Sequence, residues 1–536
     1  MTARSPSVRR RRHTRSALAT ALTLGMSVLM ACSSTDTPVP TPADSPPQVP
    51  TPSLDRDDVD AAIGQLDGYV EDMMSNTGAP GIAVAVVYKD EVLYSKGFGV
   101  RKVGEPDPVD TSTMFQLASV SKPVASSVVA SQVGAGKFDW DDPVKTYEKN
   151  FAVSDPYITE HASFTDLMSH RSGLPDHAGD LLEDLGYSYD DIIARLNQVP
   201  LEPFRDNYDY TNYGFSAAGV AAANAAGTTW ADLSEQTIYD PLGMENTTSR
   251  QDVWENSPNH AYNHVLVDPA AHTWEAKYVS DPEGQAPAGG AASSVDDMAQ
   301  WMRMELAGGT FEGTEIVDAD ALQFTHQAHS MPHPATTPGA RDSFYGIGFN
   351  VGTDAQGRVE VAHAGAFGLG ASTDLVMIPG EQLGIVVLAN TAPIGVSETI
   401  GAQFMDYAKN GALTVDWAPF VAGQFAALTS HGRSEVDYSA PPQTEAKPVS
   451  TYIGTYNSPF YGNAEIAEEG EGLVVKMGKS MQLTYPLTHY DGDTFWFEPE
   501  GENAAGPTGV TFTEGGTPTL TVEYLNNFGL GTFTRS

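Results

Sequence analysis

Cysteine is nearly absent from this chain of 536 residues, in which Cys32 is the only one. No disulfide can therefore form within the molecule. The chain also lacks a cysteine and histidine set at zinc-binding spacing, an H-E-x-x-H sequence, and a phosphate-binding glycine loop ahead of a helix. We therefore expect chemistry that uses no metal and no other cofactor.

Basic residues are scarce as well. Lys and Arg number 29 against 69 Asp and Glu, which gives a net charge of -40 at pH 7. Nucleic acid and anionic membrane surfaces are poor partners for such a chain, because like charges repel. The acidity favours either solubility or the attraction of cationic substrates, and solubility is the simpler interpretation.

The apolar run from Ala17 to Ala31 is too short to span a bilayer, which takes about 20 residues. Arginines precede it, and the pattern over 1–31 is typical of an export signal. The run ends in Leu29-Met30-Ala31-Cys32, which resembles a bacterial lipobox and implies a lipid on Cys32; the alternative is a plain signal peptide with an incidental cysteine. The proline-rich segment 32–55 then predicts an extended stalk. We expect an exported protein that contacts a membrane only through this lipid anchor, or a secreted one without it.

The chain contains one Ser-x-x-Lys sequence, Ser119-Val120-Ser121-Lys122. The residues from Pro123 to Ala130 favour a helix, so the side chains of Ser119 and Lys122 share one face. A serine hydroxyl is a weak nucleophile until a neighbouring group takes its proton, and Lys122 is placed to do so. The positive end of the helix dipole favours the anion formed during acyl transfer.

Two further motifs follow in order, Tyr210-Thr211-Asn212 and His363-Ala364-Gly365. The chain resembles the serine β-lactamase and penicillin-binding-protein family, in the branch with class C β-lactamases, D,D-carboxypeptidases, D-aminopeptidases and carboxylesterases. Other copies of the two motifs lack this order: Tyr461-Gly462-Asn463, Tyr524-Leu525-Asn526 and His177-Ala178-Gly179. Three more segments resemble family segments: 167–175, 240–244 and 287–290.

The resemblance implies an α+β catalytic domain with an antiparallel sheet flanked by helices. It also implies that Ser119 is acylated, that Lys122 and Tyr210 exchange the proton, and that Tyr210 has a lowered pKa and acts as a base. Asn212 would orient Lys122 and the substrate amide. The peptide N–H groups of Ser119 and Ala366, which follows Gly365, would form the oxyanion hole.

His363 occupies the position at which family β-lactamases carry a lysine. Imidazole is mostly neutral at pH 7, so the recognition of carboxylate-bearing substrates weakens. We therefore expect a peptidase or esterase acting on a small-molecule or peptide substrate. Two alternatives stay open: a non-catalytic protein that binds penicillin or cell-wall peptides, and a true class C-like β-lactamase. The sequence leaves the oligomeric state open.

We expect the catalytic domain over 56–425, a linker over 426–448 and a small all-β barrel over 449–536, which resembles the lipocalin-like C-terminal domains of some family members. Strands are predicted over 82–87, 91–94, 359–362, 373–378, 384–389, 472–477, 494–497 and 519–524, and helices over 215–226, 295–306 and 396–410. His363 is expected to end its strand. The aromatic residues Tyr452, Tyr456, Phe495, Trp496 and Phe497 are expected in the barrel core. His170 and His177 are expected to be structural, and loops 179–191 and 326–341 to shape specificity.

Overall fold

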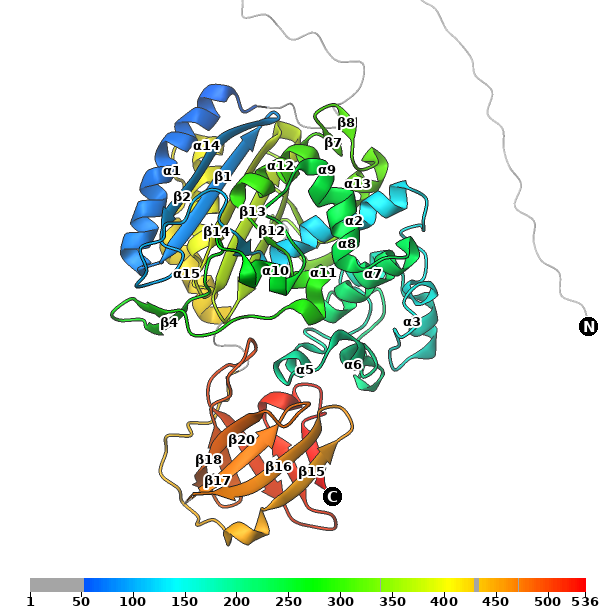
Figure 1. Cartoon of the computed structure of the whole chain (residues 1–536), viewed down its shortest axis with the longest axis vertical. Helices are drawn as coiled ribbons and strands as arrows, with labels where there is room; N and C mark the ends of the chain where they lie inside the picture. Colours follow the sequence, from blue (N-terminus) through cyan, green and yellow to red (C-terminus); the bar gives the residue numbers. More distant parts are fainter. Residues whose placement is uncertain (1–52, 338, 429–432, 471) are drawn as a thin grey trace, which may run out of the picture. The chain divides into compact units, whose positions relative to one another are not determined.

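The computed structural model describes residues 53–337, 339–428, 433–470 and 472–536 (Figure 1). The expected export signal, Cys32 and all but the end of the expected stalk lie outside the described residues. Among the helices that the structure describes, none has the length and apolar character needed to cross a membrane.

An eight-stranded antiparallel sheet forms the centre of the catalytic part, in the order β2-β1-β14-β13-β12-β11-β10-β9. The strands are β1 (Gly81–Tyr88), β2 (Glu91–Gly99), β9 (Ser330–His333), β10 (Ser343–Tyr345), β11 (Asn350–Thr353), β12 (Val359–Phe367), β13 (Ala371–Ile378) and β14 (Leu383–Ala389). Early and late strands of the chain pair, because β1 lies beside β14. This arrangement confirms the predicted fold class.

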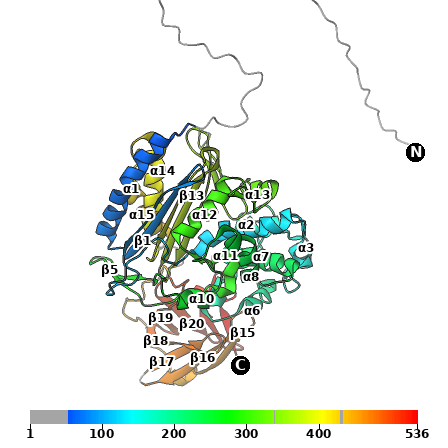
Figure 2. The ribbon, with the colours of Figure 1, turned by 45° about the horizontal axis from the view of Figure 1, so that its top comes forward.

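Helices cover both faces of the sheet (Figures 1 and 2). The main ones are α1 (Arg56–Thr77), α2 (Ser121–Gly134), α7 (Asn212–Ala226), α12 (Val295–Leu306), α14 (Val396–Asn410) and α15 (Trp417–Leu428). Strand β1 is wholly buried because its side chains alternate between two cores. Ile82 and Val84 face the cluster built with α1 and α14, whereas Ala83 and Ala85 face the cluster that contains α2, α7 and α12.

Local sequence signals set several element ends. The hairpin between β1 and β2 turns at Lys89 and Asp90, whose φ angles of 47° and 63° suit a tight hairpin turn. Helices α12 and α14 have the predicted bounds. Helix α1 was not predicted from the sequence, although Asp55 and Asp58 form a capping box at its start.

The C-terminal part is a closed antiparallel barrel, as predicted, with strands β15 to β22 in sequence order. They are β15 (Gly454–Ser458), β16 (Gly462–Glu469), β17 (Gly472–Met477), β18 (Leu483–Asp491), β19 (Thr494–Phe497), β20 (Thr508–Thr513), β21 (Thr519–Val522) and β22 (Thr532–Arg535). Four of the five expected core aromatics are buried. Trp496 is the exception: it is only partly buried and stacks on Tyr438, because alternate side chains of β19 face opposite sides.

Candidate active site

Ser119 lies in a short 3-10 turn (Ala118–Val120) immediately before α2. Ala118 has a φ of 46°, an uncommon value for a residue with a side chain, so the chain bends sharply just ahead of Ser119. Such local strain is typical of functional sites, where the surrounding structure holds it in place. The Oγ of Ser119 lies 3.1 Å from the Nζ of Lys122, so the spacing of three residues does bring the two side chains together.

Lys122 is fully buried. Its Nζ lies 2.8 Å from the Oδ1 of Asn212 and 3.0 Å from the carbonyl oxygen of Ala288, in the short helix α11 (Ala286–Gly289). Burial lowers the pKa of Lys122 to about 7, although the nearby charge of Asp180 acts in the opposite direction. A large fraction of the amine is therefore neutral near pH 7 and able to accept a proton.

Tyr210 donates its hydroxyl to the Oγ of Ser119 at 2.8 Å. Its ring lies under the Nζ of Lys122, 4.5 Å from the ring centroid. Burial raises the pKa of Tyr210 well above its usual value of 10. The expectation of a lowered tyrosine pKa is therefore wrong: in the resting site the phenol is a proton donor, and Lys122 is the better base.

Asn212 joins Lys122 to a residue that the sequence did not single out. Its Nδ2 donates to the Oδ2 of Asp180 at 2.8 Å. The same oxygen lies 2.7 Å from the Nδ1 of His177. Partial burial opposes a charge on His177, whose side chain is 53% exposed, but the hydrogen bond and the charge of Asp180 prevail and raise its pKa to about 9. Asp180 therefore holds an imidazolium on one side and the amide of Asn212 on the other.

His363 is neutral at physiological pH. Burial and the nearby charge of Lys122 lower its pKa to about 3. Its Nδ1 lies 2.6 Å from the carbonyl oxygen of Ala364, so Nδ1 carries the proton, and Nε2 accepts from the hydroxyl of Tyr345 at 2.9 Å. The expected end of the strand at His363 is wrong, since β12 continues to Phe367 by pairing with β13.

Gly365 is the point at which β12 meets the turn that holds Ser119. A Cβ at this position would lie 3.0 Å from the peptide nitrogen of Ser119, 2.3 Å from the carbonyl oxygen of Leu117 and 2.2 Å from the Oγ1 of Thr373. Only glycine fits such an approach. Ala366 is the next residue after this contact, so its peptide N–H lies in the strand segment that approaches Ser119. That the N–H groups of Ala366 and Ser119 form an oxyanion hole stays a prediction.

The other copies of the motifs lie elsewhere, with one informative exception. Tyr461 and Tyr524 belong to the barrel. His177, however, packs beside Tyr210 at 5.7 Å between ring centroids, and its peptide nitrogen donates to the carbonyl oxygen of Tyr210. His170 packs on the other side at 4.4 Å, and its Nδ1 accepts from the peptide nitrogen of Thr211 at 3.1 Å. Both histidines thus support the tyrosine loop.

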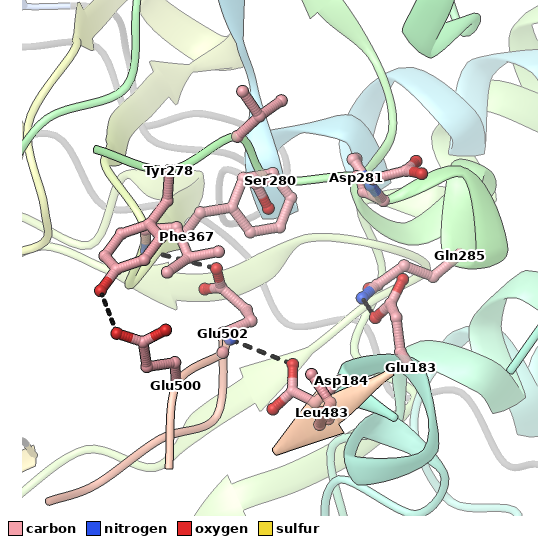
Figure 3. Close-up of a pocket in the computed structure, with 14 residues that line it drawn as sticks. Glu183, Asp184, Tyr278, Ser280, Asp281, Gln285, Phe367, Leu483, Glu500 and Glu502 are labelled. Carbon is pink, nitrogen blue, oxygen red and sulfur yellow. Dashed lines mark hydrogen bonds between the residues drawn. The ribbon is translucent and has the colours of Figure 1, made fainter. Parts of the chain in front are cut away.

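A pocket of about 290 Å³ opens beyond the end of β12, where the catalytic part meets the barrel (Figure 3). Phe367 and Tyr278 contribute aromatic walls, and carboxyl groups come from Glu183, Asp184 and Glu502. Glu183 and Asp184 belong to the expected loop 179–191, which folds into two short helices, α5 (Asp180–Asp184) and α6 (Tyr189–Ile193). No local pattern in the sequence indicated that a barrel loop reaches this region.

The fold and the arrangement of the site agree with a comparison against known protein families. The Beta-lactamase family profile matches residues 66–408, and the chain belongs to this family. Residues 439–526 match a second profile, a domain of unknown function.

Individual relatives are distant. The chain is 23% identical to "Unguisins hydrolase ungD" of Aspergillus violaceofuscus, over 81% of this chain and 82% of that protein. It is 22% identical to "D-alanyl-D-alanine-carboxypeptidase/endopeptidase AmpH" of Escherichia coli K12, over 61% and 84% respectively. Among solved structures, the octameric penicillin-binding protein homologue from Pyrococcus abyssi has a similar fold, with a TM-score of 0.58, 18% identity, and coverage of 88% of this chain and 100% of that one.

Proposed function

We propose that this protein is a serine hydrolase that forms an acyl-enzyme on Ser119 and cleaves an amide or ester. The main support is a pair of contacts at the Oγ of Ser119, which lies 3.1 Å from the Nζ of Lys122 and 2.8 Å from the hydroxyl oxygen of Tyr210. One neighbour has a pKa of about 7 and accepts a proton, and the other has a raised pKa and donates one. The hydrolase and peptidase names of the relatives support the same class.

The proton balance of the proposed reaction follows from these two groups. The Oγ of Ser119 attacks the carbonyl carbon while its proton passes to the neutral amine of Lys122. The oxyanion accepts hydrogen bonds from the peptide N–H groups of Ser119 and Ala366. Tyr210 donates its proton to the leaving nitrogen or oxygen, and Lys122 returns a proton to the phenolate. A water molecule then attacks the acyl carbon and gives a proton to Lys122; the bond between that carbon and the Oγ of Ser119 breaks, the proton passes from Lys122 to the Oγ, and the acid is released.

The setting of His363 favours a peptidase or esterase over a β-lactamase. Lysine at that position would place a permanent charge beside the substrate carboxylate, whereas burial and the nearby charge of Lys122 lower the pKa of the imidazole here to about 3 and keep it neutral. None of the residues that line the adjacent pocket is a lysine or an arginine, so the pocket offers no cationic side chain to an anionic substrate group. A true β-lactamase and a non-catalytic binder remain the alternatives that the experiment separates.

The first test is a time course of intact-protein mass after mixing with benzylpenicillin, with the drug followed in parallel. A lasting adduct that Ser119→Ala abolishes supports a D,D-peptidase-like enzyme. Rapid loss of the drug without an adduct supports a β-lactamase. Where both protein and drug stay unchanged, short-chain esters and D-amino-acid amides are assayed next. A wild-type protein that turns over none of these substrates and forms no adduct overturns the proposal.

We also propose that the enzyme works outside the cytoplasm, anchored by a lipid on Cys32. The support is the arginine-rich, apolar pattern over 1–31 and the lipobox-like end of that segment. Metabolic labelling of the expressed protein with an alkyne fatty acid tests this directly. The label should be incorporated into the wild type and lost in Cys32→Ser; equal labelling of both contradicts the assignment, and a shed, unlabelled wild type supports secretion.

A further inference from the structure

The loop between β19 and β20 is one of the places at which the barrel contacts the catalytic part. In this loop, the carboxylate of Glu502 accepts hydrogen bonds from two successive peptide nitrogens, a short one from Gly368 and one of 3.3 Å from Leu369. Gly368 and Leu369 form the turn between β12 and β13. A carboxyl group that accepts from two successive backbone donors is a directional attachment.

The same loop is held on its other side by α5. The Oδ1 of Asp184 accepts from the peptide nitrogen of Glu502, and its Oδ2 accepts from that of Asn503, both at 3.0 Å. Gly501 has a φ of 147°, and a Cβ there would lie 2.8 Å from the Cγ of Asp184. The loop therefore approaches α5 as closely as a backbone without a side chain allows, and Figure 3 shows it between the two attachments.

Each of these two contacts, at the β12–β13 turn and at α5, is connected to the catalytic residues by one secondary-structure element. The turn held by Glu502 ends β12, the strand that carries Gly365 and Ala366. In that strand Phe367 packs on Ala118, the residue before Ser119. On the other side, α5 begins with Asp180, which holds Asn212 and through it Lys122.

Removing part of a carboxyl group from water costs free energy, so simple adhesion between two parts of a protein does not call for one. Burial raises the pKa of Glu502 to about 8, with the charges of Asp184 and Asp180 acting in the same direction and the hydrogen bonds from Gly368 and Leu369 opposing them. Perturbed acids of this kind are concentrated at functional sites. The contact is also specific, because it joins two peptide groups only two and three residues beyond Ala366.

We propose that Glu502 is a positioning residue of the active site: it fixes the end of β12, and thereby the oxyanion donor at Ala366 and the ring of Phe367 beside Ser119. The barrel is then part of the working active site and not only an appended module. This inference rests on the proposed hydrolase function.

The test compares Glu502→Ala and Glu502→Gln with Glu500→Gln in the full chain. Glu500 is a matched control, since it lies in the same loop and contacts the catalytic part at the hydroxyl of Tyr278, 3.1 Å away, but it touches neither attachment described above. The measurements are kcat and KM with p-nitrophenyl acetate and the inhibition constant of phenylboronic acid, which mimics the tetrahedral adduct.

We expect Glu502→Ala to lower kcat about tenfold and to weaken the boronic acid in parallel, with KM within about twofold, because only transition-state contacts are disturbed. Glu502→Gln keeps one oxygen acceptor and should lie between Glu502→Ala and wild type. Glu500→Gln should match wild type. Wild-type kcat in both Glu502 variants, or a loss of kcat without weaker boronic acid binding, overturns the inference. Should Glu502→Ala fail to fold, kcat and the inhibition constant of phenylboronic acid for Glu502→Gln alone test the inference.

The two proposals fail in different ways. A wild-type protein that neither turns over any ester nor binds the boronic acid refutes the hydrolase function itself. Turnover by the wild type together with unaltered Glu502 variants refutes only the positioning role. Combining Glu502→Ala with Asp184→Asn adds a further check, since two residues that hold one loop should give less than the product of their separate effects.

Discussion

The amide of Asn212 is held at both ends, by the Nζ of Lys122 at its oxygen and by the Oδ2 of Asp180 at its nitrogen, each at 2.8 Å. This fixes which way the amide points, because a flipped amide would set its NH₂ against the lysine nitrogen. The oxygen of Asn212 thus accepts a hydrogen bond from Lys122 and helps to hold its Nζ in place. Asp180 controls both the geometry and the charge balance of Lys122.

Asp180→Asn should lower kcat/KM roughly 10- to 100-fold, because the orientation of Asn212 is lost and Lys122 is displaced. The charge of Asp180 raises the pKa of Lys122. Removing that charge lets the amine lose its proton at lower pH, so the acid limb of the residual activity should move to lower pH. Asp176→Asn is the control, since Asp176 is an exposed neighbour of His177 that does not touch Asn212. An unshifted limb would show that Asp180 acts by geometry alone.

The wild-type pH profile reports Lys122 directly. The proposed base works only as the neutral amine, and the pKa of Lys122 is about 7. kcat/KM should therefore rise with pH through about 7 and then level off, with no fall until the pH approaches the raised pKa of Tyr210. Lys122→Ala should lose about 10²- to 10⁴-fold in activity together with this limb. A profile that is flat from pH 5 to 9 would exclude Lys122 as the base.

Much of the fold was predictable from local pattern. Alternating apolar residues marked the central strands, and the helix over 396–410 was recognised with its correct bounds. The contact between Ser119 and Lys122 was also predictable, since it depends only on three residues of spacing near a helix start. These features are local, so a single sequence carries them.

Features that depend on tertiary contacts could not be predicted in this way. Asp180 meets Asn212 across 32 residues of sequence, and Glu502 meets Gly368 across 134. No local pattern distinguishes either carboxyl from the many others in an acidic chain. The direction of the pKa shift of Tyr210 likewise follows from its burial, which only the folded structure determines.

Tyr210→Phe should separate substrates by their leaving groups. The proposed role of Tyr210 is to protonate the departing atom, which an amide nitrogen needs and the leaving group of an activated aryl ester does not. We expect amide hydrolysis to fall about 10²- to 10⁴-fold and aryl-ester hydrolysis to fall much less. Tyr208→Phe is the control, because Tyr208 packs on His170 and Tyr345 without reaching Ser119. Equal losses on both substrate classes would point instead to a role in activating Ser119.

Gly365→Ala tests whether β12 must lie against the turn that holds Ser119. The added methyl would meet the Oγ1 of Thr373 and the carbonyl oxygen of Leu117 at less than normal contact distance, and these two groups are hydrogen-bonded to each other at 2.7 Å. We expect a loss of about 1–3 kcal/mol in the free energy of unfolding and a fall in kcat, since the strand must move away from Ser119. Gly352→Ala is the control in the neighbouring strand β11, where an added methyl meets nothing within 4 Å. The measurements are thermal unfolding and kcat of both variants. Wild-type values in Gly365→Ala would show that the strand can shift without cost. The assignment of the Ala366 N–H to the oxyanion hole would then lose its structural support.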